Sequence, residues 1–181
     1  MEVAEAGLSA LRSSPSDLGT LELIVKRPAP GERVVLARAE LDTEAGLLGD
    51  YWHSAYTTAK GRRRPKPDTQ VTMMNSRAAA LAAGSEDPER WASAGDQLYV
   101  DLDLSHANLP AGTRIAIGEA VLEVTAEPHL GCGKFTRAFG VETTKLFNSP
   151  EGRELRARGL NARVIAGGTV SPGDSVAKLT D

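Results

Sequence analysis

The single cysteine of the chain, Cys132, lies in the segment EPHLGCGKFTRAFG, which spans residues 127–140. A thiol reacts as its thiolate, and an ordinary cysteine is mostly protonated at neutral pH. Lys134 and Arg137 place cations within a turn of the sulfur, and a helix that opens at Gly133 would direct its positive end toward it. These neighbours predict an activated thiolate. The alternative is burial as a small apolar side chain, the commonest state of a lone cysteine.

Glycines flank the thiol on both sides, at Gly131 and Gly133. They leave the sulfur sterically open and allow backbone N–H groups to point at a bound anion. His129 lies three residues before the cysteine and could approach it from the other side. Nothing else in the sequence marks a catalytic triad, so a Cys-His hydrolase is the weaker interpretation.

Length and composition limit the class of protein. The 181 residues suit a single domain, which we expect over 20–181 after a flexible N-terminal tail over 1–19 with a short helix at 2–11. The formal charge of −3 does not favour nucleic acid or an anionic membrane as partner. One cysteine excludes an intrachain disulfide and a CxxC zinc or redox motif. No apolar run approaches the roughly 20 residues of a membrane span, and the N-terminus lacks a secretory signal, so a cytoplasmic protein is expected.

Strand patterns dominate the chain. They predict strands at 20–28, 31–42, 69–75, 96–105, 113–117 and 120–126, and two short strands after residue 160. Helices are expected at 76–84, 88–95 and 149–159, with one or two more within 133–149. Because tight turns link most of the strands, we predict a mainly β fold, a closed, antiparallel-rich β-barrel with several short helices.

The cysteine segment and the later stretch NSPEGRELRARGLNARVIAGGTVSPGDSV together resemble the MOSC domain, named for the C-terminal domain of molybdenum cofactor sulfurase, in its small stand-alone bacterial form. GLLGDYW at 46–52 and the stretches at 67–84 and 94–124 extend the likeness to about residues 20–180. The resemblance implies a barrel of the MOSC or pyruvate-kinase-like type. Many members carry a His-Gly-Gly segment after the Gly-Asp loop, whereas this chain has His53 and no glycine pair.

The resemblance implies two roles for Cys132. In the family, the matching cysteine is proposed to ligate the molybdenum of the molybdenum cofactor (molybdopterin) or to carry sulfur as a persulfide. Members that hold the cofactor reduce N-hydroxylated substrates, so this chain would act on a small-molecule substrate with a separate electron-donor reductase. The alternative is a sulfur carrier loaded by a pyridoxal-phosphate cysteine desulfurase. A third reading is a barrel without active chemistry that serves as an interaction domain.

A cofactor with a terminal phosphate needs anion binders beside one soft ligand. Thiolate suits the soft ligand. The candidate cofactor-binding residues are Lys134, Arg137, Asn161, Arg163 and Asn75. Their ordinary alternatives are a solvated helix face for Lys134 and Arg137, a surface strand position for Arg163 and a helix cap for Asn75.

One loop holds five basic residues and no acid: Lys60, Arg62, Arg63, Arg64 and Lys66. They could contact a phosphate or nucleic acid. A solvated loop is the expected state, because no aromatic residue interleaves and the net charge is negative.

Three aspartates each follow a glycine: Asp50, Asp96 and Asp174. Both residue types favour turns, since glycine adopts positive φ and aspartate accepts hydrogen bonds from nearby backbone. We interpret these Gly-Asp pairs as turns rather than as a carboxylate dyad.

Overall fold

A closed β-barrel forms the body of the protein, whose structure is a computed structural model that describes residues 2–54, 57–58, 61–62 and 66–180. The barrel strands are β1 (Leu18–Lys26), β7 (Val71–Asn75), β8 (Leu98–Asp101), β9 (Arg114–Ile117), β10 (Ala120–Val124), β11 (Leu160–Ala166) and β13 (Ser175–Leu179). They pair in the order β1-β13-β9-β10-β11-β7-β8, and β8 returns to β1. Only β7 and β8 are parallel among these pairs. The predicted antiparallel-rich barrel is confirmed.

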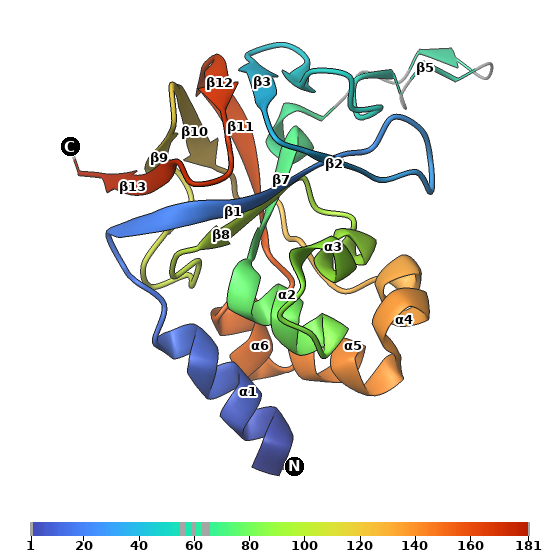
Figure 1. The fold of residues 1–181 in the computed structure, drawn as a ribbon, viewed down its shortest axis with the longest axis vertical. Helices are drawn as coiled ribbons and strands as arrows, with labels where there is room; N and C mark the ends of the chain where they lie inside the picture. The colour runs from blue at the N-terminus through green and yellow to red at the C-terminus, as the bar shows by residue number, and fades with distance from the viewer. Residues whose placement is uncertain (1, 55–56, 59–60, 63–65, 181) are drawn as a thin grey trace.

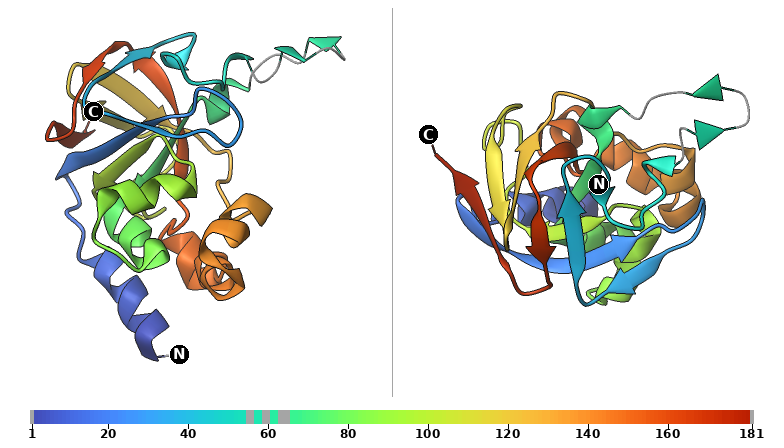
Figure 2. Two further views of the ribbon diagram at one scale, coloured as in Figure 1. Left: turned by 45° about the vertical axis from the view of Figure 1, so that its right-hand side comes forward. Right: turned by 90° about the horizontal axis from the view of Figure 1, so that it is seen from above.

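Short strands and helices surround this barrel. The other described strands are β2 (Val34–Leu36), β3 (Ala39–Asp42), β4 (Gly46–Leu47), β5 (Thr57–Thr58), β6 (Gly61–Arg62) and β12 (Gly168–Val170). The helices are α1 (Glu2–Arg12), α2 (Ser76–Ala83), α3 (Pro88–Trp91), α4 (Gly133–Phe139), α5 (Val141–Phe147) and α6 (Pro150–Glu154). Figure 1 and Figure 2 show the helices gathered toward one end of the barrel and the sheet of β12, β3 and β4 at the other.

Alternation along the strands separates two apolar layers. Met73, Leu98 and Val100 lie in the cluster inside the barrel, whereas their neighbours Met74 and Tyr99 lie in the cluster formed with the helices. Successive side chains of a strand point to opposite faces, so each strand contributes to both layers. The strands between the barrel and the helices are therefore apolar on both faces.

The N-terminal segment is packed onto the domain. Leu8 and Leu11 of α1 are buried in the helical layer, and β1 already begins at Leu18. The predicted helix over 2–11 corresponds to α1. Two leucines of α1 thus pack against the helices that cover the barrel, and the domain predicted over 20–181 stays a prediction.

The C-terminal third differs from the prediction in two places. Three strands follow residue 160 instead of two, because Gly167 lies close to the backbone of Leu41 and the chain then pairs with β3 as β12. The helix predicted over 149–159 ends at Glu154. The other helices match their predicted segments to within a few residues.

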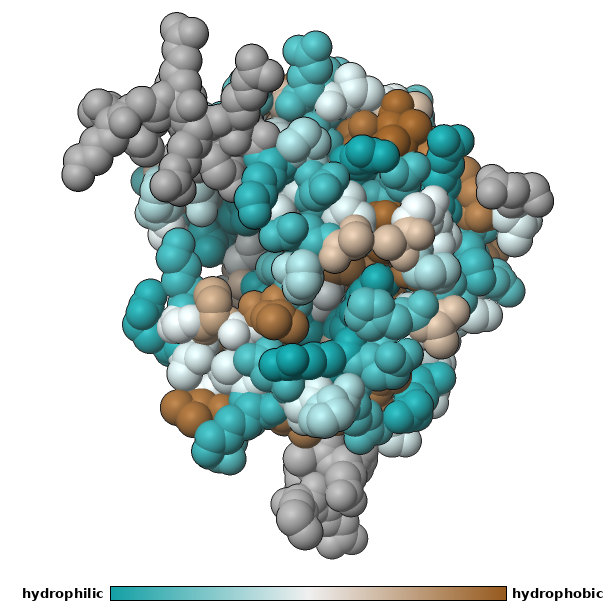
Figure 3. Space-filling model, turned by 180° about the vertical axis from the view of Figure 1, so that it is seen from behind, coloured by the Kyte–Doolittle hydropathy of each residue, from teal (hydrophilic) through white to brown (hydrophobic). Residues whose placement is uncertain are grey.

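The surface of the molecule is mixed. The face in Figure 3 is mostly hydrophilic, and its apolar side chains lie in small separate groups. Scattered apolar residues of this kind are ordinary for a folded chain. None of the helices in the described ranges is long and apolar enough to cross a membrane.

Asn75 caps α2 from within the core, and its replacement tests how far the fold depends on it. Its Oδ1 accepts hydrogen bonds from the backbone N–H groups of Arg77 and Ala78, and its Nδ2 donates to Ser14 and Leu102. We predict that Asn75→Ala lowers the free energy of unfolding by about 2 kcal/mol, measured by urea denaturation. Asp87→Ala, at the exposed cap of α3, should cost less. Equal losses would contradict this account of the buried cap.

Candidate functional site

Cys132 stands at the surface, at the start of α4. Its side chain is exposed and its backbone is extended, with φ −116° and ψ 179°. Its carbonyl oxygen accepts from the N–H and the hydroxyl of Thr136, at 2.9 and 3.1 Å. The first turn of α4 is thus held to the residue that bears the thiol. The alternative of a thiol buried in the core does not apply.

An asparagine holds the glycine that precedes the thiol. Asn148 accepts from the N–H of Gly131 at 3.0 Å and donates to its carbonyl oxygen at 3.1 Å. A Cβ atom at residue 131 would lie 3.1 Å from Thr144 and 3.3 Å from Asn148. A glycine here lets the chain approach α5 closely enough for both hydrogen bonds.

Aromatic packing anchors α4 from below. Phe135 is buried, with its ring centroid 4.9 Å from that of Phe139 and 5.5 Å from that of Phe147. The guanidinium carbon of Arg158 lies 4.8 Å from the centroid of the Phe135 ring. This cation–π contact brings a positive charge beneath the helix whose first turn follows Cys132.

A buried carboxylate binds that arginine and a histidine together. Asp96 is fully buried, and its Oδ2 accepts from Nη1 of Arg158. Its Oδ1 lies 2.7 Å from Nε2 of His129. A carboxylate only accepts hydrogen bonds, so Nε2 of the histidine carries the proton. Arg158 also donates to the carbonyl oxygen of Ala94 at 3.0 Å. We call Asp96, His129 and Arg158 the buried ion cluster.

The histidine ring lies close to the backbone of Gly159, at the start of β11. Gly159 has φ 109°, and a Cβ atom there would lie 2.3 Å from the carbonyl oxygen of Met73 and 3.2 Å from Cδ2 of His129. Residue 159 must therefore lack a side chain for β11 to start beside this ring.

The surroundings lower the pKa of the thiol. Partial burial raises the pKa of Cys132, but the backbone N–H groups of Phe135 and Lys134 and the charges of Arg158 and Lys134 lower it by more. The net pKa lies below that of an ordinary cysteine, which increases the thiolate fraction at neutral pH. The predicted activation thus has two of its proposed sources, the start of the helix and Lys134, and a third in Arg158.

The surroundings lower the pKa values of Asp96 and His129. Burial raises the pKa of Asp96, yet the charges of Arg158 and His129 and their hydrogen bonds lower it to about 2. Burial lowers the pKa of His129, an effect that the adjacent Asp96 only partly offsets. At neutral pH the cluster is therefore a carboxylate, a guanidinium and a neutral imidazole. It is suited to holding structure in place rather than to exchanging protons.

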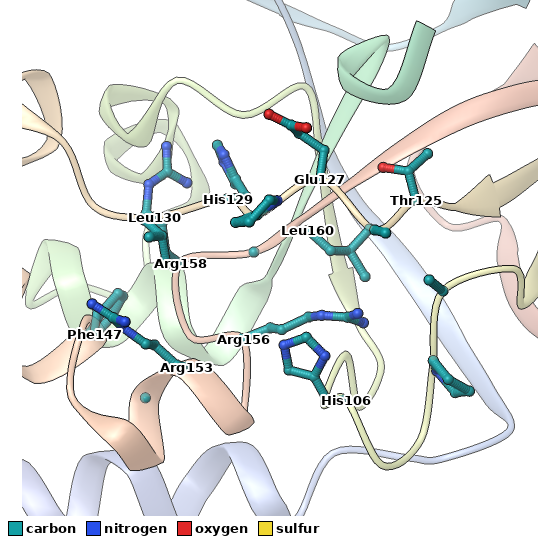
Figure 4. Close-up of a pocket in the computed structure, with 16 residues that line it drawn as sticks. His106, Thr125, Glu127, His129, Leu130, Phe147, Arg153, Arg156, Arg158 and Leu160 are labelled. Atoms are coloured by element: carbon teal, nitrogen blue, oxygen red, sulfur yellow. The ribbon is translucent and has the colours of Figure 1, made fainter.

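Two cavities lie on either side of the segment Glu127–His129. The larger, of about 430 Å³, also reaches Leu130, Phe147 and the turn after α6 (Figure 4). The smaller, of about 340 Å³, is bounded by Tyr51, Trp52 and Asn161 among others. Cys132 follows the shared wall by three residues and lines neither cavity. The described residues contain no group of three or more His, Cys, Asp and Glu side chains that could hold a metal ion.

The structure places the predicted site residues in different parts of the molecule. Lys134 and Arg137 are exposed on α4, next to the thiol. Asn161 is buried beside the smaller cavity, and its Nδ2 donates to the carbonyl oxygens of Glu127 and Pro128 at 3.1 and 3.3 Å.

Arg163 and Asn75 take the ordinary alternatives. Arg163 donates from Nε to Glu123 on the neighbouring strand β10 at 3.1 Å, so a carboxylate already occupies its guanidinium. Asn75 uses its amide entirely within the fold, as the cap of α2. Asn75 therefore offers no free group to a cofactor, whereas Nη1 of the exposed Arg163 makes no hydrogen bond among the described residues.

Asp96 and Arg158 were missed as site residues. The Gly-Asp pattern indicates a turn at Asp96, and Gly95 does have φ 87°. Its partners lie 33 and 62 residues away, however, and no local pattern connects them. The one available signal was the alternating R-A-R run of Arg156 and Arg158 directly before a strand.

Of the basic loop, Lys66 forms an ion pair with Glu127 at 3.5 Å, while Lys60, Arg63 and Arg64 lie outside the described residues. Arg62 belongs to β6. The departure from the family at His53 falls just before this loop, and the ring of His53 lies 6.3 Å from that of Trp52.

Comparisons with known proteins agree with this architecture. The sequence model of the MOSC domain matches residues 60–177. Among curated proteins, no sequence matches the chain.

Solved structures share the fold. The crystal structure of a hypothetical protein has a TM-score of 0.60 at 22% identity, over 95% of this chain and 71% of its own. YuaD from Bacillus subtilis has a TM-score of 0.59 at 19% identity, over 88% and 94%. YiiM from Escherichia coli has a TM-score of 0.57 at 21% identity, over 90% and 70%. At these identities the likeness shows the fold alone.

The lowered pKa of the thiol can be tested through its reactivity. We predict that Lys134→Gln slows alkylation of Cys132 by iodoacetamide at neutral pH by about two- to fivefold, because an exposed cation contributes modestly. The measurement is the alkylation rate against pH, whose midpoint should move upward. Lys145→Gln, on α5 and paired with Glu142, serves as the control and should leave the profile unchanged. Identical profiles for all three proteins would refute the role of Lys134.

The buried ion cluster predicts a pH dependence of stability. The pKa of Asp96 is lowered to about 2, whereas an unfolded aspartate titrates near 3.9. Its stabilisation is therefore complete above about pH 4 and is lost as the pH falls toward about 2. We expect Asp96→Asn to lower the free energy of unfolding at neutral pH by about 3–5 kcal/mol, since it leaves a buried guanidinium unpaired. Urea denaturation from neutral to acidic pH measures both effects, and a loss that is the same at every pH would contradict the assignment.

Proposed function

The chain belongs to the MOSC domain family, and from this premise we propose that Cys132 binds the molybdenum of a molybdenum cofactor through its thiolate. The family is generally linked to this cofactor. The protein would then support reduction of N-hydroxylated or similar small substrates. Because the sequence carries no flavin, haem or iron–sulfur signature, electrons would come from a separate donor reductase.

The observation that carries the proposal is an exposed thiol whose pKa is lowered by its own helix and by two cations. Thiolate is the soft donor that molybdenum accepts alongside the sulfur ligands of its own pterin. The described residues offer no cluster of three or more protein ligands, which suits a metal that arrives already ligated. The donor set of this chain thus fits the cofactor.

The residues that would hold the group lie around the thiol. Cys132 would bind the metal, and the cations of Lys134 and Arg137 would attract the anionic pterin, since neither has an acidic partner among the described residues. Asn161 fixes the carbonyl groups of Glu127 and Pro128 and so shapes the approach to Cys132. When bound, the cofactor supplies the redox-active metal. The chain supplies binding, orientation and electrostatics.

A second candidate function is favoured by one observation: the thiol is exposed and lines neither cavity. A sulfur carrier needs such a thiolate within reach of another protein. Cys132 would attack the outer sulfur of a persulfide on a pyridoxal-phosphate cysteine desulfurase. A new S–S bond would form on Cys132 while the S–S bond of the desulfurase breaks and its cysteine leaves as a thiolate. The exchange is balanced without an added oxidant or reductant.

Metal and mass analysis separates the two functions. We predict that protein from a host that makes the cofactor contains about one molybdenum per chain and that Cys132→Ser lacks it, by elemental analysis. Arg163→Gln is the matched control and should retain the metal, because Arg163 is already bound by Glu123. Both variants should keep the urea midpoint of the parent.

Other outcomes decide against the first function. Molybdenum retained in Cys132→Ser would show that the thiol is not its ligand. Metal-free parent protein whose Cys132 gains the mass of one sulfur after incubation with a desulfurase and cysteine would support the carrier. Metal-free protein that gains no sulfur would contradict both functions.

A further inference from the structure

The larger cavity is built by three segments that lie far apart in the sequence. The loop that contains His106, the segment that leads to Leu130, and the turn after α6 converge on it (Figure 4). Its volume of about 430 Å³ is in the range of small-molecule sites. The cavity shares its wall with the approach to Cys132 but does not include the thiol.

A buried arginine without a counterion extends into this space. Arg156 is 8% exposed, and its Nη1 donates to the carbonyl oxygens of Leu104 and Leu109 at 3.2 and 2.6 Å. Its Nε and Nη2 make no hydrogen bond within the described part of the chain, and Figure 4 shows the guanidinium reaching into the cavity. Among the described residues, no carboxylate lies within 4.0 Å of it.

Arg158, which is also buried, and the half-buried Arg27 behave differently. Arg158 pairs with Asp96, and Arg27 binds Asp50 through two nitrogens at 2.9 Å each. Buried charges are normally paired, because leaving one unpaired costs free energy. Glu154 influences the charge of Arg156 from a distance but forms no ion pair with it. Arg156 therefore lacks the carboxylate partner that Asp96 provides for Arg158.

The backbone at Arg156 also costs free energy. It has φ 46°, the one positive φ of a non-glycine residue in the described ranges. The N–H of Arg156 bonds to the carbonyl of Arg153 and the N–H of Ala157 to that of Gly152, which is the Schellman pattern that ends a helix. Its left-handed position usually takes glycine. An arginine held there at a steric cost indicates that its side chain is needed.

The remaining walls define what the cavity would accept. Arg153 at the rim also lacks an acidic partner among the described residues, and the nearby Glu127 is paired with Lys66. Leu130, Phe147 and Leu160 add apolar surface. The cavity thus combines an uncompensated positive end with an apolar body.

We infer that this cavity binds a small organic molecule that carries a carboxylate or a phosphate on an apolar body, with Arg156 as the anion-binding residue. Its Nε and Nη2 offer the two parallel donors that suit such oxyanions. This site needs neither a metal nor Cys132. Binding there can therefore be tested independently of the proposed function, and the bound ligand would lie along the approach to the thiol.

Titration with a simple probe tests the inference. Phenyl phosphate is titrated by calorimetry into protein from a host that cannot make the cofactor. We expect saturable binding at millimolar Kd or tighter, with inorganic phosphate weaker because it lacks the apolar body. Arg156→Gln retains a donor for the Leu109 carbonyl but removes the charge, and should weaken binding by about tenfold or more.

Two controls keep the result interpretable. Arg38→Gln, on the exposed turn between β2 and β3, removes a charge outside the cavity and should leave the Kd unchanged. Cys132→Ser should also bind the probe normally, so failure of the metal-binding function leaves this test intact. Unchanged binding in folded Arg156→Gln, or no saturable binding by the parent protein, would overturn the inference.

A second experiment identifies the molecule that carries the anionic group bound by Arg156. Arg156→Gln is purified from a host that makes the cofactor and its molybdenum is measured. Loss of molybdenum together with loss of probe binding would identify the oxyanion as the phosphate of the cofactor. Retained molybdenum with lost probe binding would identify a separate carboxylated or phosphorylated ligand.

Discussion

The carboxylate of Asp96 is the interaction on which the candidate site depends. It is fully buried and joins His129, from the segment that leads to the thiol, to Arg158, from the segment that leads into β11. Residues far apart in the sequence thereby meet at one charge, at the entry to β8. A buried carboxylate is tolerated only when its partners compensate it, so the three side chains must occupy these positions together. The path of the chain on both sides of the shared cavity wall follows from that requirement.

Arg158 connects the buried carboxylate of Asp96 to the exposed thiol. The same guanidinium that pairs with Asp96 lies over the ring of Phe135, and its charge lowers the pKa of Cys132. The thiol itself remains exposed, so it is reactive without being enclosed. A buried ion pair thus lies beneath an exposed thiol, which suits either a metal ligand or a sulfur carrier. Arg156 differs from Arg158 because it is buried without an acidic partner. We therefore assign Arg158 to the fold and Arg156 to ligand binding.

The sequence could predict the features that depend on residues close together in the chain. Period-two alternation located most barrel strands, and Asn75 and Gly84 mark the ends of α2. Cys132 and its helix were found from glycines and cations within a few residues. The buried ion cluster was not, because its members pair across 33 and 62 residues and a Gly-Asp turn is locally indistinguishable from a structural carboxylate. The ion pair of Arg163 was not predicted for the same reason, since Glu123 lies 40 residues away on the adjacent strand.

We propose that the Cys132 sulfur is a ligand of molybdenum. X-ray absorption at the molybdenum edge measures the sulfur atoms around the metal directly, in protein prepared with the cofactor. The free cofactor, measured in the same buffer, provides the comparison. We predict one sulfur neighbour more around the metal in the protein than in the free cofactor. The same sulfur shell in both would contradict a bond to Cys132.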